Sequence, residues 1–451
     1  MFTILLCKLL CRLGALLGRG SSLPGAICLK LDPRVLRRLQ LPANIVAVTG
    51  SNGKTSTAAL IAEVAEKAGL RVLCNREGSN QKEGITTLLL RNANPFTRKV
   101  DADVLVLESD ERFCQYTFAD ITPGHIVITN LFRDQLTRNG HPQFVKGELA
   151  KGLPAESVLI LNANEPTSCS YGFGRENSSY YGVSAASMMT APDSFFAYHD
   201  GAFCPVCGGR MQYSRRISGQ VGEYSCTQCA FKTPETVHAV TAQDEMGSFI
   251  LDGQYTVRPQ LVNAAYAQNI AAAYTACTEA LGIAPEQAAA LLDGTTLANG
   301  RLVEFEMNGC KGLFMLCKHE NSMAYNGGIE TALCPTEEEL TVVFIVDRLS
   351  RKYVANDMSW LWDINFERLA DERVKRIVVS GGFAHDVAAR MEFARLDMAR
   401  VDVCPDLDEM MQTLQQKAQG SIYVFTCFTD QNKFLSRLAK LQAAQEGGSE
   451  A

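Results

Sequence analysis

The stretch that decides the fold is Ile45-Val-Ala-Val-Thr-Gly-Ser-Asn-Gly-Lys-Thr55, which is followed by residues rich in Ala, Glu and Lys up to Gly69. The apolar run at its start predicts a short buried strand. Strand, glycine loop and helix in this order are typical of a unit that binds phosphate groups. The helix is predicted from apolar residues that recur at the spacing of one helix face, namely Leu60, Ile61, Val64 and Ala68.

The loop departs from the usual phosphate-loop pattern G-x-x-x-x-G-K-[ST], because Val48 stands at its first glycine and the glycine falls at Gly50. Its N–H groups can still point at a bound phosphate, and the following helix adds its positive end. Lys54 can reach the β and γ phosphates, and the Thr55 hydroxyl can ligate Mg²⁺. A glycine turn without a ligand is the alternative. We expect a nucleotide site formed by Gly50, Ser51, Asn52, Gly53, Lys54, Thr55 and Ser56.

Glu108 ends the strand-like run 104–107. A carboxylate at the carboxyl end of a parallel strand lies at the mouth of such a site, where a second Mg²⁺ ligand is needed. We therefore predict that Glu108 is this ligand, with Asp110 and Glu111 as close rivals. A loop residue without a ligand is the alternative.

The chain of 451 residues suggests about three folding units. Strand-like runs at 104–107, 126–129 and 158–161 have long connections between them, which predicts a doubly wound, mostly parallel α/β sheet. Runs at 313–317, 342–346, 377–380 and 423–426 indicate a second α/β domain. The expected division is an N-terminal helical segment at 1–44, an ATP-binding domain at 45–299 with a cysteine-rich insert at 202–233, and a C-terminal α/β domain at 300–451.

Composition excludes several classes of protein. Apolar residues make up 47% and charged residues 20%, which excludes a disordered or fibrous chain. The net charge of −6 argues against broad coating of nucleic acid. Sixteen cysteines fit a reducing compartment, with some of them bound to metal. We therefore expect a cytoplasmic protein.

The N-terminal 20 residues are apolar but carry Lys8, Arg12 and Arg19, so they predict no membrane-spanning helix. Their leucines recur at helical spacing, and two interpretations stay open. The helix packs on the body of the protein, or it rests on a membrane surface.

Two C-x-x-C pairs, separated by 18 residues, form the clearest metal-binding pattern. Each pair can sit on a tight knuckle, so that four thiolates converge on Zn²⁺. Four protein ligands leave no open position, which predicts a structural site. A redox pair, two disulfides or a nucleic-acid-binding ribbon are the alternatives. The expected ligands are Cys204, Cys207, Cys226 and Cys229.

The loop Val48-Thr-Gly-Ser-Asn-Gly-Lys-Thr-Ser56 resembles the nucleotide loop of the Mur ligases, which join an amine to a carboxylate using ATP. More narrowly, the chain resembles the MurT family, the ligase-like subunits of lipid II isoglutaminyl synthases. The cysteine insert within such a domain and the motif Ser359-Trp-Leu-Trp-Asp363 are more specific than the loop alone. Further matching stretches are 21–33, 75–85, 128–140, 161–166, 300–306 and 356–367.

The resemblance implies a Mur-ligase-type ATP-binding domain with a zinc ribbon and a Rossmann-like C-terminal domain that faces a partner. It implies amidation of the D-glutamate α-carboxylate in the lipid II stem peptide through an acyl phosphate, with ATP, Mg²⁺ and Zn²⁺. A GatD-like glutaminase, joined to the chain as a heterodimer, would supply ammonia, and D-isoglutamine would be the product. No nucleic acid is expected as a partner. The lipid-linked substrate implies work at the inner membrane face.

The resemblance also implies roles for single residues. Asn269 resembles the Asn that contacts adenine, and Arg301 resembles an Arg near the phosphates. Asp357 resembles the Asp that the family supplies as third member of the partner's Cys-His-Asp triad, where it would orient the His. Asp363 is its rival, and a helix cap or a surface turn is the structural alternative. The two tryptophans of the chain, Trp360 and Trp362, then fit a surface that faces the partner, with packing in a core as the alternative.

Some positions depart from the family pattern. The family's K-N-P-x-G-x-N stretch is represented by Lys318 and Asn326 at a longer spacing and without the Pro. Phe132 stands where many Mur ligases carry a His, as the MurT pattern expects.

Two other functions stay open. A stand-alone Mur-type or folylpolyglutamate-type ligase would add an amino acid without a partner. A nucleotide-gated zinc-ribbon binding protein would carry out no chemistry. Lys54, Thr55 and Glu108 argue against this last function, since Mg²⁺ and γ-phosphate machinery suits turnover.

Overall fold

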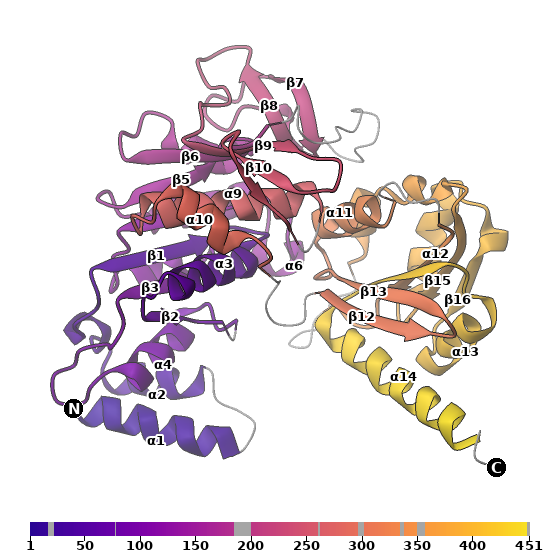
Figure 1. The fold of residues 1–451 in the computed structure, drawn as a ribbon, viewed down its shortest axis with the longest axis horizontal. Helices are drawn as coiled ribbons and strands as arrows, with labels where there is room; N and C mark the ends of the chain where they lie inside the picture. Colours follow the sequence, from indigo (N-terminus) through magenta and orange to yellow (C-terminus); the bar gives the residue numbers. More distant parts are fainter. Residues whose placement is uncertain are drawn as a thin grey trace. The chain divides into compact units, whose positions relative to one another are not determined.

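The computed structural model describes residues 1–16, 22–76, 78–184, 200–259, 262–295, 302–333, 338–349 and 357–448 (Figure 1). The chain folds into two compact units. The first contains Met1–Phe132 and the described residues of 141–296. The second contains the described residues from 302 onward together with Arg133–Gly140. The segment Arg133–Gly140 lies within 45–299, the range expected for the ATP-binding domain.

The first unit is built on a nine-stranded sheet with the order β11-β10-β9-β6-β5-β4-β1-β3-β2. Strands β1 (Asn44–Thr49), β3 (Val104–Glu108) and β4 (His125–Ile128) are neighbours and parallel, with Val48 opposite Glu108 and Thr49 opposite Ile128. This register places the loop after β1 and the carboxylate of Glu108 at the same sheet edge. The parallel sheet predicted from the sequence is confirmed.

Burial explains why these segments form strands. All residues of β1 after Asn44 are buried, and so is every residue of β3, as expected for strands with helices on both faces. Helix α3 (Lys54–Lys67) packs on β3 and on α9 (Ala264–Glu279). The unit also contains α2 (Leu23–Leu31), β2 (Val72–Cys74), α4 (Lys82–Asn92), α5 (Cys114–Phe118), α7 (Pro142–Lys151), β5 (Val158–Asn162), α8 (Pro166–Cys169), β6 (Ser178–Val183), β9 (His238–Gln243), β10 (Phe249–Leu251), β11 (Tyr255–Val257) and α10 (Pro285–Leu292).

Helix α1 (Phe2–Leu16) packs on α2 and α4, mainly through Ile4 and Cys7, which are buried. Leu5, Leu9 and Leu13 do not provide this contact, because they are exposed, whereas Leu6 and Leu10 are half-buried. Nearly every position of the helix is apolar, so its periodicity does not single out the buried face. Among the described residues, every helix is too short or too polar to cross a membrane.

The second unit has a six-stranded sheet with the order β12-β13-β17-β14-β15-β16. Strands β13 (Cys310–Leu316), β17 (Ser421–Thr426), β14 (Leu340–Ile345), β15 (Val374–Ser380) and β16 (Val401–Cys404) run parallel, and β12 (Leu302–Met307) is antiparallel to β13. The helices are α6 (Leu136–Asn139), α11 (Ser322–Ala332), α12 (Ala384–Phe393), α13 (Leu407–Lys417) and α14 (Phe428–Gly448).

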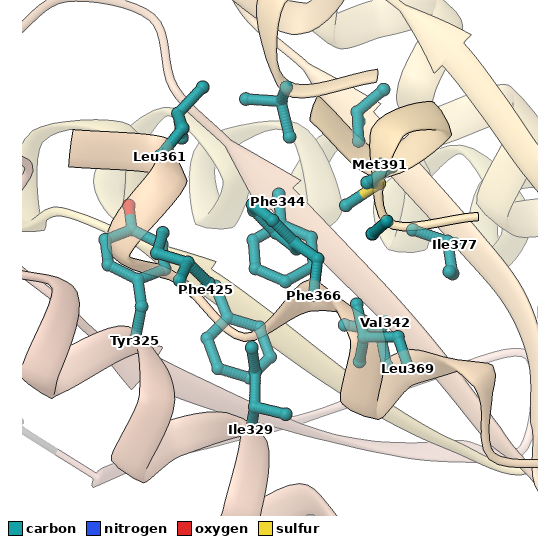
Figure 2. Packing of buried hydrophobic residues seen from close by; sticks show 14 of the residues in the cluster. Tyr325, Ile329, Val342, Phe344, Leu361, Phe366, Leu369, Ile377, Met391 and Phe425 are labelled. Carbon is teal, nitrogen blue, oxygen red and sulfur yellow. The ribbon is translucent and has the colours of Figure 1, made fainter. Parts of the chain in front are cut away.

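An aromatic cluster fills the core on one face of this sheet (Figure 2). Phe344 stacks on Phe425 with ring centroids 4.8 Å apart and meets Phe366 edge to face at 5.3 Å. Tyr325 of α11 covers the same rings, at 6.3 Å from each of Phe344 and Phe425. These side chains are at most 1% exposed. Their packing fixes α11 against the sheet, and with it the residues that precede α11.

We predict that Phe344→Ala lowers the free energy of unfolding of the second unit by about 3–5 kcal/mol, because it leaves a cavity among the rings. Phe393→Ala is the matched control. Phe393 is 71% exposed and contacts the ring of Trp362 in a tilted arrangement, so its loss should cost at most about 1.5 kcal/mol. Urea unfolding followed by far-UV circular dichroism measures both, and equal losses would contradict this assignment of the core.

Candidate active site

The turn between β1 and α3 requires two glycines. Gly50 has φ +128° and Gly53 has φ +81°, in the region that side chains with a Cβ rarely adopt. A Cβ on Gly50 would lie 2.3 Å from Oγ1 of Thr129, and one on Gly53 would lie 2.3 Å from Oδ1 of Asn269. Both glycines therefore allow the chain to double back tightly into α3.

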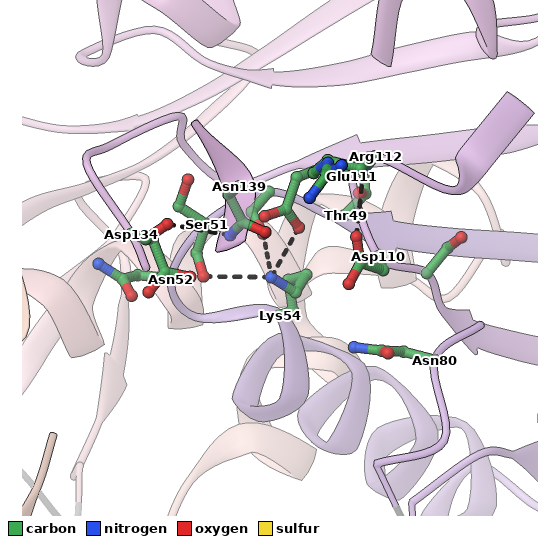
Figure 3. A network of polar contacts seen from close by, with 12 residues as sticks. Thr49, Ser51, Asn52, Lys54, Asn80, Asp110, Glu111, Arg112, Asp134 and Asn139 are labelled. Carbon is green, nitrogen blue, oxygen red and sulfur yellow. Dashed lines mark hydrogen bonds and ion pairs between the residues drawn. The ribbon is translucent and has the colours of Figure 1, made fainter. Parts of the chain in front are cut away.

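Lys54, the first residue of α3, is buried and turns its ammonium group back over the loop (Figure 3). The ammonium donates to the carbonyl oxygens of Gly50 and Ser51 and lies 3.0 Å from the Glu111 carboxylate. Glu111 is also buried, so each charge compensates the other in a region of low dielectric. A lysine held at this point places a positive charge beside the carbonyl groups of the loop, at the start of α3.

Thr55 and Glu108 lie together at this sheet edge. The Thr55 hydroxyl donates to Oε2 of Glu108 at 2.8 Å, and the Asn80 amide donates to the other carboxylate oxygen at 3.1 Å. The Asn75 side-chain amide donates to the carbonyl of Glu108 and accepts from its N–H, each at 2.8 Å. A hydroxyl and a carboxylate side by side are oxygen ligands of the kind that Mg²⁺ prefers.

The other loop residues are fixed by the segment that follows β4. Asn130 accepts from the N–H groups of Ser51 and Asn52, through its carbonyl and its side chain. The Ser51 hydroxyl donates to the carbonyl of Phe132 and accepts from its N–H. Ser56 is buried in the first turn of α3. Hydrogen bonds from the segment after β4 to the side chains and backbone of the loop therefore preorganise the loop.

Asn269 lies on α9, where its Oδ1 is 3.5 Å from the Thr57 hydroxyl and faces Gly53. This position, half-buried beside the loop, is not that of a freely solvated helix residue. Arg301, the other residue that we expected near the phosphates, lies outside the described residues.

The four cysteines of the two C-x-x-C pairs converge beside the hairpin of β7 (Met211–Ser218) and β8 (Val221–Cys226). The sulfur atoms of Cys204 and Cys229 are 3.8 Å apart, and those of Cys207 and Cys226 are 3.5 Å apart. Four thiolates at Zn–S bonds of about 2.3 Å would be separated by about 3.8 Å in a tetrahedron. Backbone N–H groups two residues downstream donate to Cys204, Cys207 and Cys226. The donor set fits zinc.

Asp357 and Asp363 differ in their surroundings. Asp357 is exposed, and its carboxylate accepts from the N–H of Ser359 at 2.9 Å, so it caps the short 3₁₀ turn Ser359–Asp363. The hydrogen bonds of Ser359 hold the pKa of Asp357 below its usual value. Asp363 instead forms an ion pair of 2.9 Å with Arg133. The exposed carboxylate is the one that an external group can reach.

The two tryptophans do not share one surface. Trp360 is 2% exposed and packs on Tyr325 in the core, so our expectation that it faces a partner was wrong. The two tryptophans lie two positions apart in a 3₁₀ turn, which has three residues per turn, so their side chains point in different directions. Trp362 is 53% exposed, and its ring is tilted against that of Phe393 with centroids 5.1 Å apart.

Lys318 and Asn326, which represent the family's K-N-P-x-G-x-N stretch, hydrogen-bond to different partners. The Lys318 ammonium and the Asn321 amide both contact the buried carboxylate of Asp134, at 3.3 and 2.9 Å. Asn326 instead hydrogen-bonds the backbone of Asp363 and Asn365. Sequence reasoning missed Asn321, although its position one residue before α11 is a helix-cap signal. It also assigned no role to Asn75 and Asn80, although both lie in the family-matching stretch 75–85 before α4.

Two family models match the chain. The Mur ligase middle domain matches residues 48–222, and the MurT ligase C-terminal domain matches residues 319–430. A lipid II isoglutaminyl synthase (glutamine-hydrolyzing) subunit MurT of Staphylococcus aureus is 28% identical over 385 residues, 84% of each chain. The subunit of the same name from Streptococcus pneumoniae is 28% identical over 445 residues, 95% of each chain.

Solved structures show the same fold at low identity. A pseudomurein peptide ligase type C from Methanothermus fervidus has a TM-score of 0.68 at 17% identity, covering 89% of this chain and 80% of its own. The MurF ligase of Thermotoga maritima in complex with ADP has a TM-score of 0.56 at 14% identity, covering 90% and 80%. The phosphate-type loop, the Mur ligase fold and the two domain matches agree: this chain contains a Mur ligase middle domain and a MurT ligase C-terminal domain, and over most of its length it is similar to MurT subunits of lipid II isoglutaminyl synthases.

Proposed function

We propose that this chain is the ATP-dependent synthetase subunit of a lipid II isoglutaminyl synthase. It would amidate the α-carboxylate of D-glutamate in the lipid II stem peptide, with ammonia supplied by a glutaminase partner. One observation carries the proposal: relatives of that name align over up to 95% of this chain, including both units. A stand-alone ligase that adds an amino acid is less well supported, because the C-terminal unit matches the MurT model.

The loop geometry supports the first chemical step. A carboxylate is a poor electrophile, and phosphorylation makes it one that ammonia can attack. Lys54 would neutralise the charge that develops on the transferred phosphoryl group. Its contact with the phosphoryl group would replace the contact with Glu111. Thr55 and Glu108 would hold Mg²⁺, which neutralises phosphate charge when bound. Asn269 would contact the adenine, and Arg301 would approach the phosphates.

Lys54→Ala should lower kcat for ATP-dependent amidation at least about 100-fold, because a preorganised charge at the transferred group is lost. Lys67→Ala, at the other end of α3, is the matched control. The Lys67 side chain is 41% exposed and its ammonium pairs with Glu63, so activity should be unchanged. The assay supplies ammonium chloride as nitrogen donor and follows ADP release. Similar activity in both variants would overturn the assignment of the loop.

The inserted ribbon is proposed to hold one structural Zn²⁺. The four cysteine sulfurs would be its ligands, and the N–H donors to three of them would stabilise the thiolates. Hydrogen bonding from Gln228 lowers the pKa of Cys226 to about 6, which favours the form that binds metal.

We expect the double variant Cys207→Ser/Cys226→Ser to lose one equivalent of zinc per chain relative to the wild type, by mass spectrometry of the digested protein. Cys310→Ser is the control, since Cys310 lies outside the ribbon and should keep the zinc content. An unchanged zinc content in the double variant would rule out the ribbon site.

The exposed Asp357 is proposed to complete the triad of the partner glutaminase, where it would orient the catalytic His. The exposed pair Trp362 and Phe393 lies on the same unit and would provide apolar contact area for that partner. Exposed Leu5, Leu9 and Leu13 on α1, with Arg12 exposed among them, support contact with the inner membrane face, where the lipid-linked substrate lies.

In the complex, Asp357→Asn should reduce glutamine hydrolysis on the order of 10³-fold, because an amide stabilises the wrong tautomer of the partner's His. Ammonia-dependent amidation should be unaffected, which separates the triad role from misfolding. Asp363→Asn serves as comparison and should leave hydrolysis within a few-fold. Full hydrolysis in the Asp357→Asn complex, with the Asp363→Asn complex impaired, would transfer the role to Asp363.

A further inference from the structure

A His-Cys-Asp cluster lies at the carboxyl edge of the second sheet and is used by none of the steps above. His319 follows β13, Cys427 follows β17, and Asp430 lies in the first turn of α14. Strands β13 and β17 are adjacent and parallel, with Leu316 opposite Thr426. The topology therefore brings side chains more than 100 positions apart in the sequence to one point, at the edge where α/β sheets place their ligands.

The three ligand atoms converge. Oδ2 of Asp430 lies 3.6 Å from Nε2 of His319 and 3.6 Å from Sγ of Cys427. Each residue offers one ligand atom within 4.8 Å of the other two. Bonds to zinc of about 2.0–2.3 Å at tetrahedral angles would separate the ligand atoms by about 3.3–3.8 Å. The Nε2–Oδ2 separation is too long for a strong N–H···O hydrogen bond but matches ligands that share one ion. The Sγ–Oδ2 separation fits an S–H···O hydrogen bond in the metal-free protein and also fits two ligands of one ion.

Within the described part of the chain, the buried His319 imidazole makes no hydrogen bond through Nε2, the nitrogen that faces the cluster. His319 is 5% exposed, and its Nε2 has no hydrogen-bond partner among the described residues. Its other nitrogen, Nδ1, lies 3.1 Å from the Tyr325 hydroxyl. An imidazole oriented through Nδ1, with Nε2 left to face a carboxylate and a thiol, is the usual arrangement of a metal-binding histidine.

The other ligands are oriented in the same way. Lys433 donates to Oδ1 of Asp430 at 2.9 Å and also pairs with Asp347, which leaves Oδ2 facing His319 and Cys427. Cys427 lies with its sulfur 3.6 Å from the same carboxylate oxygen. The thiolate is the form that binds metal.

A catalytic triad would use the same residue types in a different arrangement. In a triad the imidazole stands between nucleophile and acid, with one ring nitrogen toward each. Here Asp430 faces Nε2, and Nδ1 is engaged by Tyr325. The thiol and the carboxylate also approach each other directly, at 3.6 Å. This geometry suits a shared ion better than a proton relay.

We propose that His319, Cys427 and Asp430 bind a second Zn²⁺, separate from that of the cysteine ribbon. Nitrogen, sulfur and oxygen ligands together suit zinc, and three protein ligands leave the fourth position open to water or another small ligand.

The test is the zinc content of the full-length chain after equilibration with Zn²⁺ in excess Mg²⁺ and desalting. We expect two zinc ions in the wild type and one in His319→Gln and in Cys427→Ser. Cys207→Ser/Cys226→Ser should also hold one, and its combination with His319→Gln none. His385→Gln, an exposed histidine of the same unit, and Cys310→Ser are matched controls that should keep both ions.

Co²⁺ gives a second readout that reports on the ligands. In the Cys207→Ser/Cys226→Ser background, added Co²⁺ should produce a thiolate-to-cobalt charge-transfer band that Cys427→Ser abolishes. It should also quench Trp360, whose ring centroid is 6.3 Å from that of His319, with Trp362→Phe removing the other tryptophan. One zinc ion in the wild type, or two in His319→Gln, would overturn the proposal. The wild-type count decides even if a variant fails to fold.

Discussion

The tight turn after β1 is the constraint on which the rest of the site depends. At Gly50 the backbone adopts φ +128°, and a Cβ there would lie 2.7 Å from the carbonyl oxygen of Asn130 as well as against Thr129. Because the chain doubles back at this point, α3 begins directly behind the loop, and Lys54 and Thr55 fall on its first turn. The parallel pairing of β1 with β3 then brings Glu108 to Thr55. The proposed phosphate contacts and metal ligands thus follow from one turn and one register.

The two units place their polar side chains by the same rule. In the first, the functional side chains follow β1 and β3, and in the second, His319 and Cys427 follow β13 and β17. Strand interiors are covered by helices and must be apolar, so the carboxyl edge is where polar groups from distant segments can meet. Buried charges there are compensated pairwise, as Lys54 is by Glu111 and as Asp430 is by Lys433.

The sequence predicted the main parallel strands of both sheets, the loop and the cysteine pairs, because each depends on neighbours within a few positions. It did not predict β2, the strands from β6 to β12, or β16. Glu108 could be predicted by the same reasoning, since it ends a strand beside the loop. Cys427 was not: among 16 cysteines it has no ligand spacing, and its neighbour His319 is more than 100 positions away in the sequence. Trp360 was misplaced because a 3₁₀ turn buries one tryptophan and exposes the other. Contacts between distant segments depend on topology, which local pattern does not encode.

The central claim is that this chain activates a carboxylate by phosphorylation and that ammonia then displaces the phosphate. If so, a carboxylate oxygen leaves with the phosphate. The most direct measurement uses lipid II labelled with ¹⁸O in the D-glutamate α-carboxylate, incubated with the chain, ATP, Mg²⁺ and ammonium chloride. The account predicts one ¹⁸O atom in each inorganic phosphate released, together with D-isoglutamine. Unlabelled phosphate, or release of AMP, would contradict it.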